Sequence, residues 1–376
     1  MASPVRLSLM IGPAVPVPVP QAVLDALVRV QVMTTSGETS SGFELTFSLS
    51  KRSPLQTLFL LSGGGSIPLV RVVIVVTING SPEVLMDGVM TNHELSPGEN
   101  GGPSTLTIRG KDLTAVMDYV DFSGMLYPAM PPEARVALIL AKYMAFGCIP
   151  MVIPSVLIDI PIPVERIPTQ EGTDLAYVTS LADEVGYTFY VSPGPAVGTS
   201  VAYWGPEIRI GAPQPALNVD MDAHTNVERL GFSYDTESRE LPILVIQEPR
   251  SKALIPIPVP DITPLSPPLG LVPPLPKKFY IIDGTAKLGP IRSALIGLAK
   301  AAKSSDAVTG TGSLDVARYG RVLKARGLVG VRGAGPAFDG LYYVKSVTHT
   351  IARGDYKQEF TLARNGLVST LQSVPA

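Results

Sequence analysis

Apolar and polar residues alternate along much of the first 120 positions. In the stretch Gly42–Ser50 every second residue is apolar, as in a strand with one buried face. The continuous apolar run Leu69–Gly80 predicts a buried strand that ends in an Asn-Gly turn, and Ser104–Leu113 predicts a further strand. Frequent strands separated by Gly, Ser and Asn turns predict an antiparallel barrel or sandwich over residues 1–120.

The period changes to that of helices between residues 121 and 205. The segment "PPEARVALILAKYMAFG" opens with Pro at an expected first helical position and closes at Gly147. The segment "TDLAYVTSLADEVGY" places its apolar residues on one face and ends at Gly186, a typical C-terminal capping glycine. Two strand patterns follow around "PGPAVG". We therefore expect a small α+β domain at 121–205.

Strand patterns return at 206–250 and 325–376, which predicts a second β-barrel domain split by an insertion at 251–324. The insertion begins with the Pro-dense stretch Ile255–Lys278, which predicts an extended, polyproline-like strap. An amphipathic helix is expected at Pro290–Lys303. The fold class is thus mainly β, with two tube-like antiparallel barrels flanking a small α/β domain.

The C-terminal segment "FDGLYYVKSVTHTIARGDYKQEFTLARNGL" contains Arg353-Gly354-Asp355, which in other settings is an adhesion signal. If Arg353 and Gly354 form a tight turn, apolar pairs fall on one face of a hairpin and polar pairs on the other. Gly354 then supplies the positive φ of a primed turn. The predicted apolar-face pairs are Ile351 with Tyr356, His349 with Gln358, Val347 with Phe360, and Lys345 with Leu362. The predicted polar pairs are Thr350 with Lys357, Thr348 with Glu359, and Ser346 with Thr361.

This register explains the tripeptide without any receptor. The residues that we expect to form the structural hairpin are Gly340, Tyr343, Val347, His349, Gly354, Tyr356 and Phe360.

Charged residues make up 16% of the chain and hydrophobic residues 45%. The charged share is below the roughly 25% usual for globular proteins, so we expect much of the surface to be covered by other subunits. The net charge of -2 gives no indication of nucleic-acid recognition or an acidic lipid surface. Prolines interrupt the N-terminal apolar stretch and the stretch Val136–Val164, which argues against a cleaved signal and a membrane span.

The residues of common catalytic and metal sites are missing or scattered. Cys148 is the single cysteine, which excludes an intrachain disulfide and a Cys-based zinc site. We find no nucleophile elbow, no His-Glu-x-x-His pair and no dinucleotide fingerprint, and "TGTGS" at Thr309–Ser313 has neither strand context nor phosphate-loop spacing. We expect no catalytic residue, no cofactor and no metal. Cys148 is expected to be a small core residue.

Two acidic groups allow alternatives. Asp220, Asp222 and His224 alternate and could face one metal ion, but a polar strand face or turn is favoured. The carboxylates Glu171, Asp174, Asp183 and Glu184 lie on or beside one predicted helix, where a solvated helix side is favoured over a glycosidase pair.

Four segments together resemble the late-control D, or tail hub, proteins of contractile bacteriophages. They are "DGVMTNHELSPG...STLTIRGKDLTAVMD", "ARVALILAKYMAFG", "EGTDLAYVTSLADEVGYTFYV" and "FDGLYYVKSVTHTIARGDYKQEFTLARNG", and they span most of the chain in the family's order. Related hubs occur in phage-like injection systems and in the N-terminal part of type VI secretion spike proteins.

The resemblance implies a non-enzymatic baseplate hub that forms a homotrimer and adapts a sixfold tail tube to a threefold spike. It implies partners among tail tube or tube-initiator proteins, baseplate wedge proteins and a spike on a separate polypeptide. It also implies synthesis in the bacterial cytoplasm and a place in a virion tail or injection particle. The family pattern does not account for the Pro-rich stretch and the helix at Pro290–Lys303, which we expect to brace a neighbouring subunit or the inner baseplate. The alternatives are a tail-associated peptidoglycan hydrolase and a secreted adhesive β protein.

Overall fold

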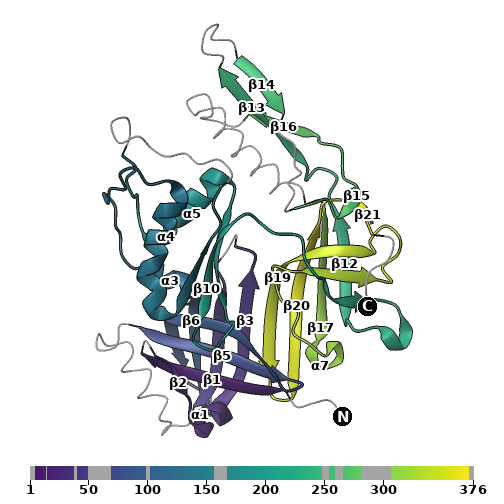
Figure 1. Cartoon of the computed structure of the whole chain (residues 1–376). Coiled ribbons are helices and arrows are strands. Elements are labelled where there is room, and N and C mark those ends of the chain that lie inside the picture. Colours follow the sequence, from purple (N-terminus) through teal and green to yellow (C-terminus); the bar gives the residue numbers. More distant parts are fainter. Residues whose placement is uncertain are drawn as a thin grey trace.

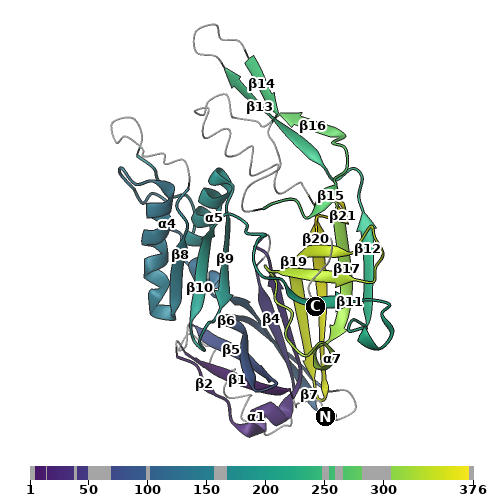
Figure 2. The ribbon, with the colours of Figure 1, turned by 45° about the vertical axis from the view of Figure 1, so that its right-hand side comes forward.

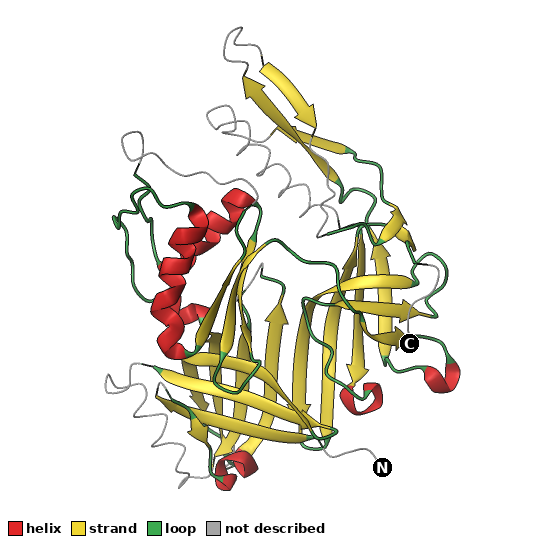
Figure 3. Ribbon diagram, in the orientation of Figure 1, coloured by secondary structure: helices red, strands yellow, loops and turns green. Residues whose placement is uncertain are grey.

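The computed structural model describes residues 5–13, 15–37, 40–49, 69–98, 102–155, 167–247, 254–258, 266–281 and 306–371. The described chain is mainly antiparallel β-structure, with its longer helices gathered in one unit beside the strands (Figures 1 and 3). The helix expected at Pro290–Lys303 lies outside the described residues.

One sheet of 13 strands joins the N-terminal and C-terminal parts of the chain. Its main path runs β12-β17-β20-β19-β3-β4-β7-β6-β5-β1-β2, and β18 branches from β19 to pair with β11. The N-terminal strands are β1 (Arg6–Pro13), β2 (Val17–Pro18), β3 (Leu27–Thr35), β4 (Gly42–Leu49), β5 (Val70–Ile78), β6 (Ser81–Ser96) and β7 (Ser104–Asp112). The C-terminal strands are β11 (Gln214–Asn218), β12 (Arg229–Tyr234), β17 (Val308–Asp315), β18 (Leu328–Arg332), β19 (Gly340–Ala352) and β20 (Asp355–Arg364).

The two β regions meet at an antiparallel junction between β3 and β19, from Ser346 opposite Thr35 to Ala352 opposite Arg29. The two expected barrels are therefore two halves of one sheet. In the part of the chain that the structure describes, no strand pairing closes either half into a separate barrel. Figure 1 shows β3 beside β19 and β20, and Figure 2 shows β4, β19 and β20 of the same sheet from a second side.

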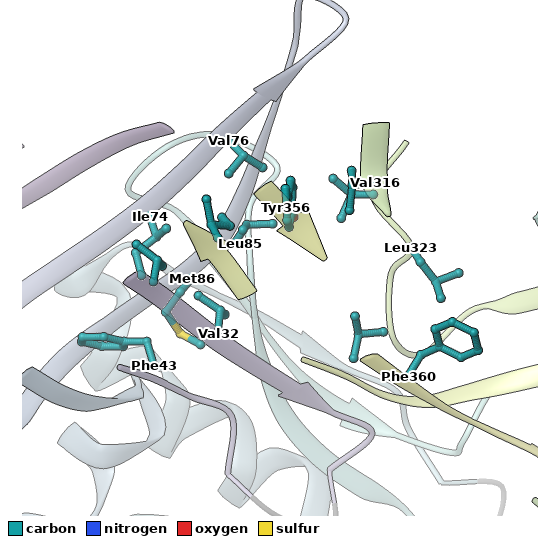
Figure 4. Packing of buried hydrophobic residues seen from close by; sticks show 14 of the residues in the cluster. Val32, Phe43, Ile74, Val76, Leu85, Met86, Val316, Leu323, Tyr356 and Phe360 are labelled. Carbon is teal, nitrogen blue, oxygen red and sulfur yellow. The ribbon is translucent and has the colours of Figure 1, made fainter. Parts of the chain in front are cut away.

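Strand alternation produces one hydrophobic core that runs through both halves. In β4 the residues Phe43, Leu45, Phe47 and Leu49 are all buried, and the intervening residues are half-buried. The same cluster contains Val32, Ile74 and Met86 from the N-terminal half and Tyr356 and Phe360 from the C-terminal half (Figure 4). Burial of this shared apolar face is the main force that holds the two halves together.

The strand β17 corrects the expectation for "TGTGS". Val308–Asp315 is a full strand between β12 and β20, so the insertion ends well before residue 324. Gly310 and Gly312 lie on its apolar face, where an added Cβ would come within 2.9 Å of Phe232 and 2.6 Å of Phe360. The glycines give these rings room, and their low strand propensity hid the strand from the pattern.

The α+β unit lies between the two β regions in sequence. It contains α3 (Thr114–Met117), α4 (Pro132–Ala141), the 3₁₀ helix η2 (Lys142–Phe146), β8 (Cys148–Val152), α5 (Asp174–Val185), β9 (Thr188–Pro193) and β10 (Ser200–Gly205). The sheet order is β8-β10-β9, with β8 parallel to β10. Helix α5 begins at the N-cap Thr173 and ends at Gly186 in the left-handed region, as its sequence predicts. Trp204, fully buried, belongs to a second core.

Two arginines, the buried Arg71 and the half-buried Arg326, attach this unit to the β regions. Arg71 of β5 makes a two-contact ion pair with Asp87 of β6, both at 2.7 Å, and donates to the Gly198 carbonyl at 2.9 Å. Arg326, from the C-terminal half, stacks over the Tyr190 ring at 3.9 Å and donates to Ser192. The α+β unit is therefore tied to both halves of the sheet.

The remaining elements are short or lie at the rim. They are α1 (Gln21–Ala26), the 3₁₀ helix η3 (Asp222–His224), β13 (Glu240–Gln247), β14 (Leu254–Pro258), β15 (Gly270–Val272), β16 (Lys278–Ile281), α7 (Val316–Tyr319) and β21 (Leu367–Ser369). Strands β14, β13 and β16 form a small sheet that projects from the body (Figure 1). The Pro-rich stretch thus contributes edge strands outside the central sheet, where prolines are tolerated.

Candidate functional site: a polar face shared by eight strands

The C-terminal hairpin has the predicted register over most of its length. Three apolar-face pairs and three polar pairs are found as expected: Ile351–Tyr356, His349–Gln358, Val347–Phe360, Thr350–Lys357, Thr348–Glu359 and Ser346–Thr361. The expected pair of Lys345 with Leu362 is wrong. A β-bulge at Lys345 shifts the register, so that Val344 pairs with Leu362.

The bulge aims Lys345 away from the ladder, as bulges commonly do. Its Nζ lies 3.2 Å from Asp306 Oδ2, and Arg209 contacts the same carboxylate through two nitrogens at 2.5 and 2.9 Å. The Arg209 guanidinium also lies 4.9 Å from the centre of the Tyr343 ring. These cations lower the pKa of the buried Asp306 carboxyl against the effect of its burial. The cluster attaches the segment after β10 to β19.

The turn itself is Arg353-Gly354, between the paired residues Ala352 and Asp355. Gly354 has φ 78°, and Arg353 is not among the residues with positive φ. Positive φ at the second turn position fits a type II turn and not the primed turn that we expected. Arg353 Nη2 donates to the Asp25 carbonyl of α1, so the tripeptide holds the hairpin tip against the N-terminal half.

The other hairpin residues face the core. Gly340 begins β19 at φ 133°, and Tyr343, Val347, Tyr356 and Phe360 are buried. His349 is buried as well, with Nδ1 2.8 Å from Tyr356 Oη, and burial lowers its pKa to about 3. His349 is therefore a neutral core residue on the apolar face of the hairpin, paired with Gln358 as expected.

The opposite face of the sheet is polar from one edge to the other. Registered pairs follow this face from β12 through β17, β20, β19, β3, β4 and β7 to the second half of β6. Its residues, all half-buried or exposed, are Arg229, Gly231, Ser233, Thr309, Thr311, Ser313, Lys357, Glu359, Thr361, Ser346, Thr348, Thr350, Arg29, Gln31, Met33, Glu44, Thr46, Ser48, Thr105, Thr107, Arg109, Asn92, Glu94 and Ser96. We call this set the polar face.

Charges of both signs are mixed on the polar face. Arg109 Nε lies 2.8 Å from Glu44, and its Nη1 lies 3.5 Å from Glu94. Lys357 lies 2.8 Å from Glu228, and this contact raises the pKa of Lys357. Most other members are Thr, Ser or Gln. A face of this kind is well hydrated and has no strong affinity for one sign of charge. The sequence predicted the part of the polar face that lies on the C-terminal hairpin. The remainder of the polar face depends on the register between strands that are far apart in the chain.

The acidic groups do not form a site. Asp222–His224 is a 3₁₀ helix, and among the described residues no group of three or more His, Cys, Asp or Glu side chains is placed to hold a metal ion. Asp174 corrects the expectation of a solvated helix side, because it is fully buried. It accepts hydrogen bonds from Tyr143 Oη at 2.7 Å and Gln170 Nε2 at 2.8 Å, and Lys142 Nζ lies 2.5 Å away. Its carboxylate is held by the fold and gives no support to a hydrolase.

Cys148 begins β8 and is buried, as expected for a small core residue. Burial raises the pKa of its thiol to about 12. In the part of the chain that the structure describes, no helix has the length and apolarity needed to cross a membrane.

The fold is similar to that of solved structures of phage tail proteins and of a type VI secretion component. The chain has a TM-score of 0.62 with the tail protein from Neisseria meningitidis MC58, at 15% identity, covering 96% of this chain and 98% of that one. It has a TM-score of 0.61 with the prophage MuSo2 43 kDa tail protein from Shewanella oneidensis, at 14% identity, covering 96% and 99%.

A third solved structure is an E. coli component of the type VI secretion system, described as similar to the bacteriophage T4 tail proteins gp27 and gp5. Its TM-score is 0.51 at 13% identity, covering 93% of this chain and 76% of that one. No protein-family model and no curated protein matches the sequence. The likeness therefore concerns the fold.

Proposed function

We propose that the chain is a non-enzymatic baseplate hub of a contractile tail or injection system. Three copies form a ring in which the polar face lines a central channel. The ring adapts a sixfold tail tube to a threefold spike. The observation that supports this function best is the polar face itself, which runs without interruption over both halves of the chain and is backed by one apolar core.

The two halves of the sheet explain how a threefold ring meets a sixfold tube. Each half contributes four strands to the polar face, so three copies present six similar four-stranded units. A tube protein, or a tube-initiator protein, would dock on that sixfold end, a spike protein on the threefold end, and wedge proteins on the outside. The proposed hub is located in a virion tail or an injection particle. The structural likeness to tail proteins supports this assignment.

Native mass spectrometry and negative-stain electron microscopy of the purified full chain test the ring. We expect a trimer with threefold symmetry and a central channel. A protein that stays monomeric at tens of micromolar would contradict the proposal.

Site-specific labelling tests which face lines the channel. Thr348→Cys lies on the polar face, and Thr179→Cys lies on the exposed side of α5. Each variant is biotinylated with a maleimide and mixed with streptavidin; Cys148 is buried in both. Streptavidin density should block the channel of the Thr348 variant and decorate the outer wall of the Thr179 variant. The reverse pattern would place the polar face outside.

A further inference from the structure

The two halves of the sheet are repeats of one another. Strands β6-β7-β4-β3 and β19-β20-β17-β12 follow the same antiparallel order. Both first strands are long and carry a bulge at the same place, at Thr91 in β6 and at Lys345 in β19. Before the bulge each pairs with an outer strand, β5 or β18. When the two bulges are superimposed, Asn92 of β6 is equivalent to Ser346 of β19. Following the strand pairing from there, Gln31 of β3 is equivalent to Gly231 of β12.

Comparison of the two halves shows that the strand at each edge of the polar face lacks a partner strand that its equivalent has. Within the chain, the last strand of the first unit, β3, pairs with the first strand of the second, β19. The equivalent strands β12 and the second half of β6 have no partner on their outer side among the described residues. One chain therefore carries equivalents of both strands of the β3–β19 junction. These are β12 at one edge of the polar face and the second half of β6 at the other.

Exposure along β6 shows the effect of this missing neighbour. Val347 and His349 of β19 are 0% and 4% exposed, because β3 covers them. Their equivalents in β6, His93 and Leu95, are exposed, Leu95 at 51%, although they pair with buried residues of β7. An apolar side chain on the core side of a sheet is normally covered.

We infer that β12 of one copy pairs antiparallel with the second half of β6 in the next copy, in the register of the β3–β19 junction. This inference rests on the proposed function, which supplies the closed ring of three. Met33 lies opposite Thr348, so Ser233 should lie opposite Glu94 of the neighbour. By the same rule Gly231 lies opposite Ser96 and Asp235 opposite Asn92. On the apolar side, Phe232 covers the neighbour's Leu95.

Paired cysteines in the full-length chain test the register. In Glu94→Cys/Ser233→Cys the two thiols lie directly opposite across the seam, with Cβ atoms about 5 Å apart. In the control, Glu94→Cys/Arg229→Cys, the second thiol is four residues away along β12, a shift of about 13 Å. Glu94, Ser233 and Arg229 are all exposed, so neither variant disturbs the core. Both proteins are oxidised with copper phenanthroline and separated on a non-reducing gel, and their masses are measured by native mass spectrometry.

The in-register variant should form covalent dimers and trimers, at least tenfold more than the control. Trimers that cross-link equally in both variants, or only in the control, would overturn the register and leave the ring proposal standing. Trimers without any cross-link would place the seam elsewhere. If neither variant nor the unmodified chain forms trimers, the ring and the seam are both wrong.

Discussion

His349 shows how a residue that suggests chemistry can serve the core instead. Its imidazole is buried beside Tyr356 and Gln358 within hydrogen-bond distance, and burial keeps it neutral by lowering its pKa to about 3. The unfolded chain binds a proton at His349 below about pH 6.5, while the folded chain does not. Stability from this residue is therefore complete above pH 6.5 and is lost as the pH falls toward 3.

We expect His349→Gln to weaken this dependence. Between pH 7.5 and 5 the wild-type protein should lose about 2 kcal/mol more unfolding free energy than the variant, because the unfolded histidine is protonated over about 1.5 pH units. Urea denaturation at fixed protein concentration measures the difference. Between pH 7.5 and 8.5 the two proteins should respond alike. An equal response over the acidic range would show that His349 is protonated in the folded state.

Gly354 tests the turn of the hairpin. Its φ of 78° is unfavourable for a β-branched side chain, although an added Cβ would meet no atom within 4 Å. Gly354→Val should therefore cost about 1–2 kcal/mol of unfolding free energy through backbone strain. Gly354→Asn should cost less, because Asn adopts left-handed conformations more readily. Equal stability of both variants in urea denaturation would show that the turn can change its conformation.

At the scale of elements, the attachment of the α+β unit depends on groups that no local pattern reveals. Arg71 and Asp87 lie on adjacent buried strands, and Arg71 reaches Gly198 in another unit. Their pairing is an effect of tertiary structure, whereas α5 and the hairpin are local and could be predicted from capping residues and alternation. The boundaries of the insertion could not, since the glycines of β17 resemble a loop.

Loss of the Arg71 side chain should loosen this attachment. Arg71→Met leaves the Asp87 carboxylate buried without its main cation, and we expect a loss of about 3–5 kcal/mol of unfolding free energy. The pair Arg109–Glu44 provides a control, because the Arg109 side chain is exposed and Arg109→Met should leave the unfolding free energy nearly unchanged. Denaturant unfolding and limited proteolysis between the β regions and residues 121–205 provide the measurements. A small effect at Arg71 would show that Asp87 finds another cation or water.

At the scale of the whole molecule, the polar face and its two open edges define the proposed assembly. The sequence predicted a β-rich chain with much covered surface and a hub-like order of segments. It could not predict the proposed seam, because Leu95 and Phe232 lie on strands that are far apart in the chain and are related only through the structural repeat. The polar face likewise depends on pairing between residues as distant as Met33 and Thr348.

A carboxylate at Leu95 should oppose assembly without unfolding the chain. Leu95 and Leu138 are both 51% exposed, which makes Leu138→Asp, on α4, a matched control for Leu95→Asp. Facing Phe232 in the seam, the introduced carboxylate would be buried without a cation, and we expect the trimer to require at least about tenfold more protein. Mass photometry across a dilution series measures this. Equal dilution curves for the two variants would exclude Leu95 from the interface.

The two open edges also determine the order in which copies can join. In the proposed ring two copies share one seam, whereas the third copy forms two seams while losing its translational freedom only once, so its addition is far more favourable. Dimers should be scarce at every concentration, and monomers should convert to rings in an all-or-none manner. A copy added at the wrong angle leaves the same edges free to continue as a filament, because head-to-tail contacts close only at one rotation. Formation of the proposed ring is therefore a problem of closure as much as of affinity.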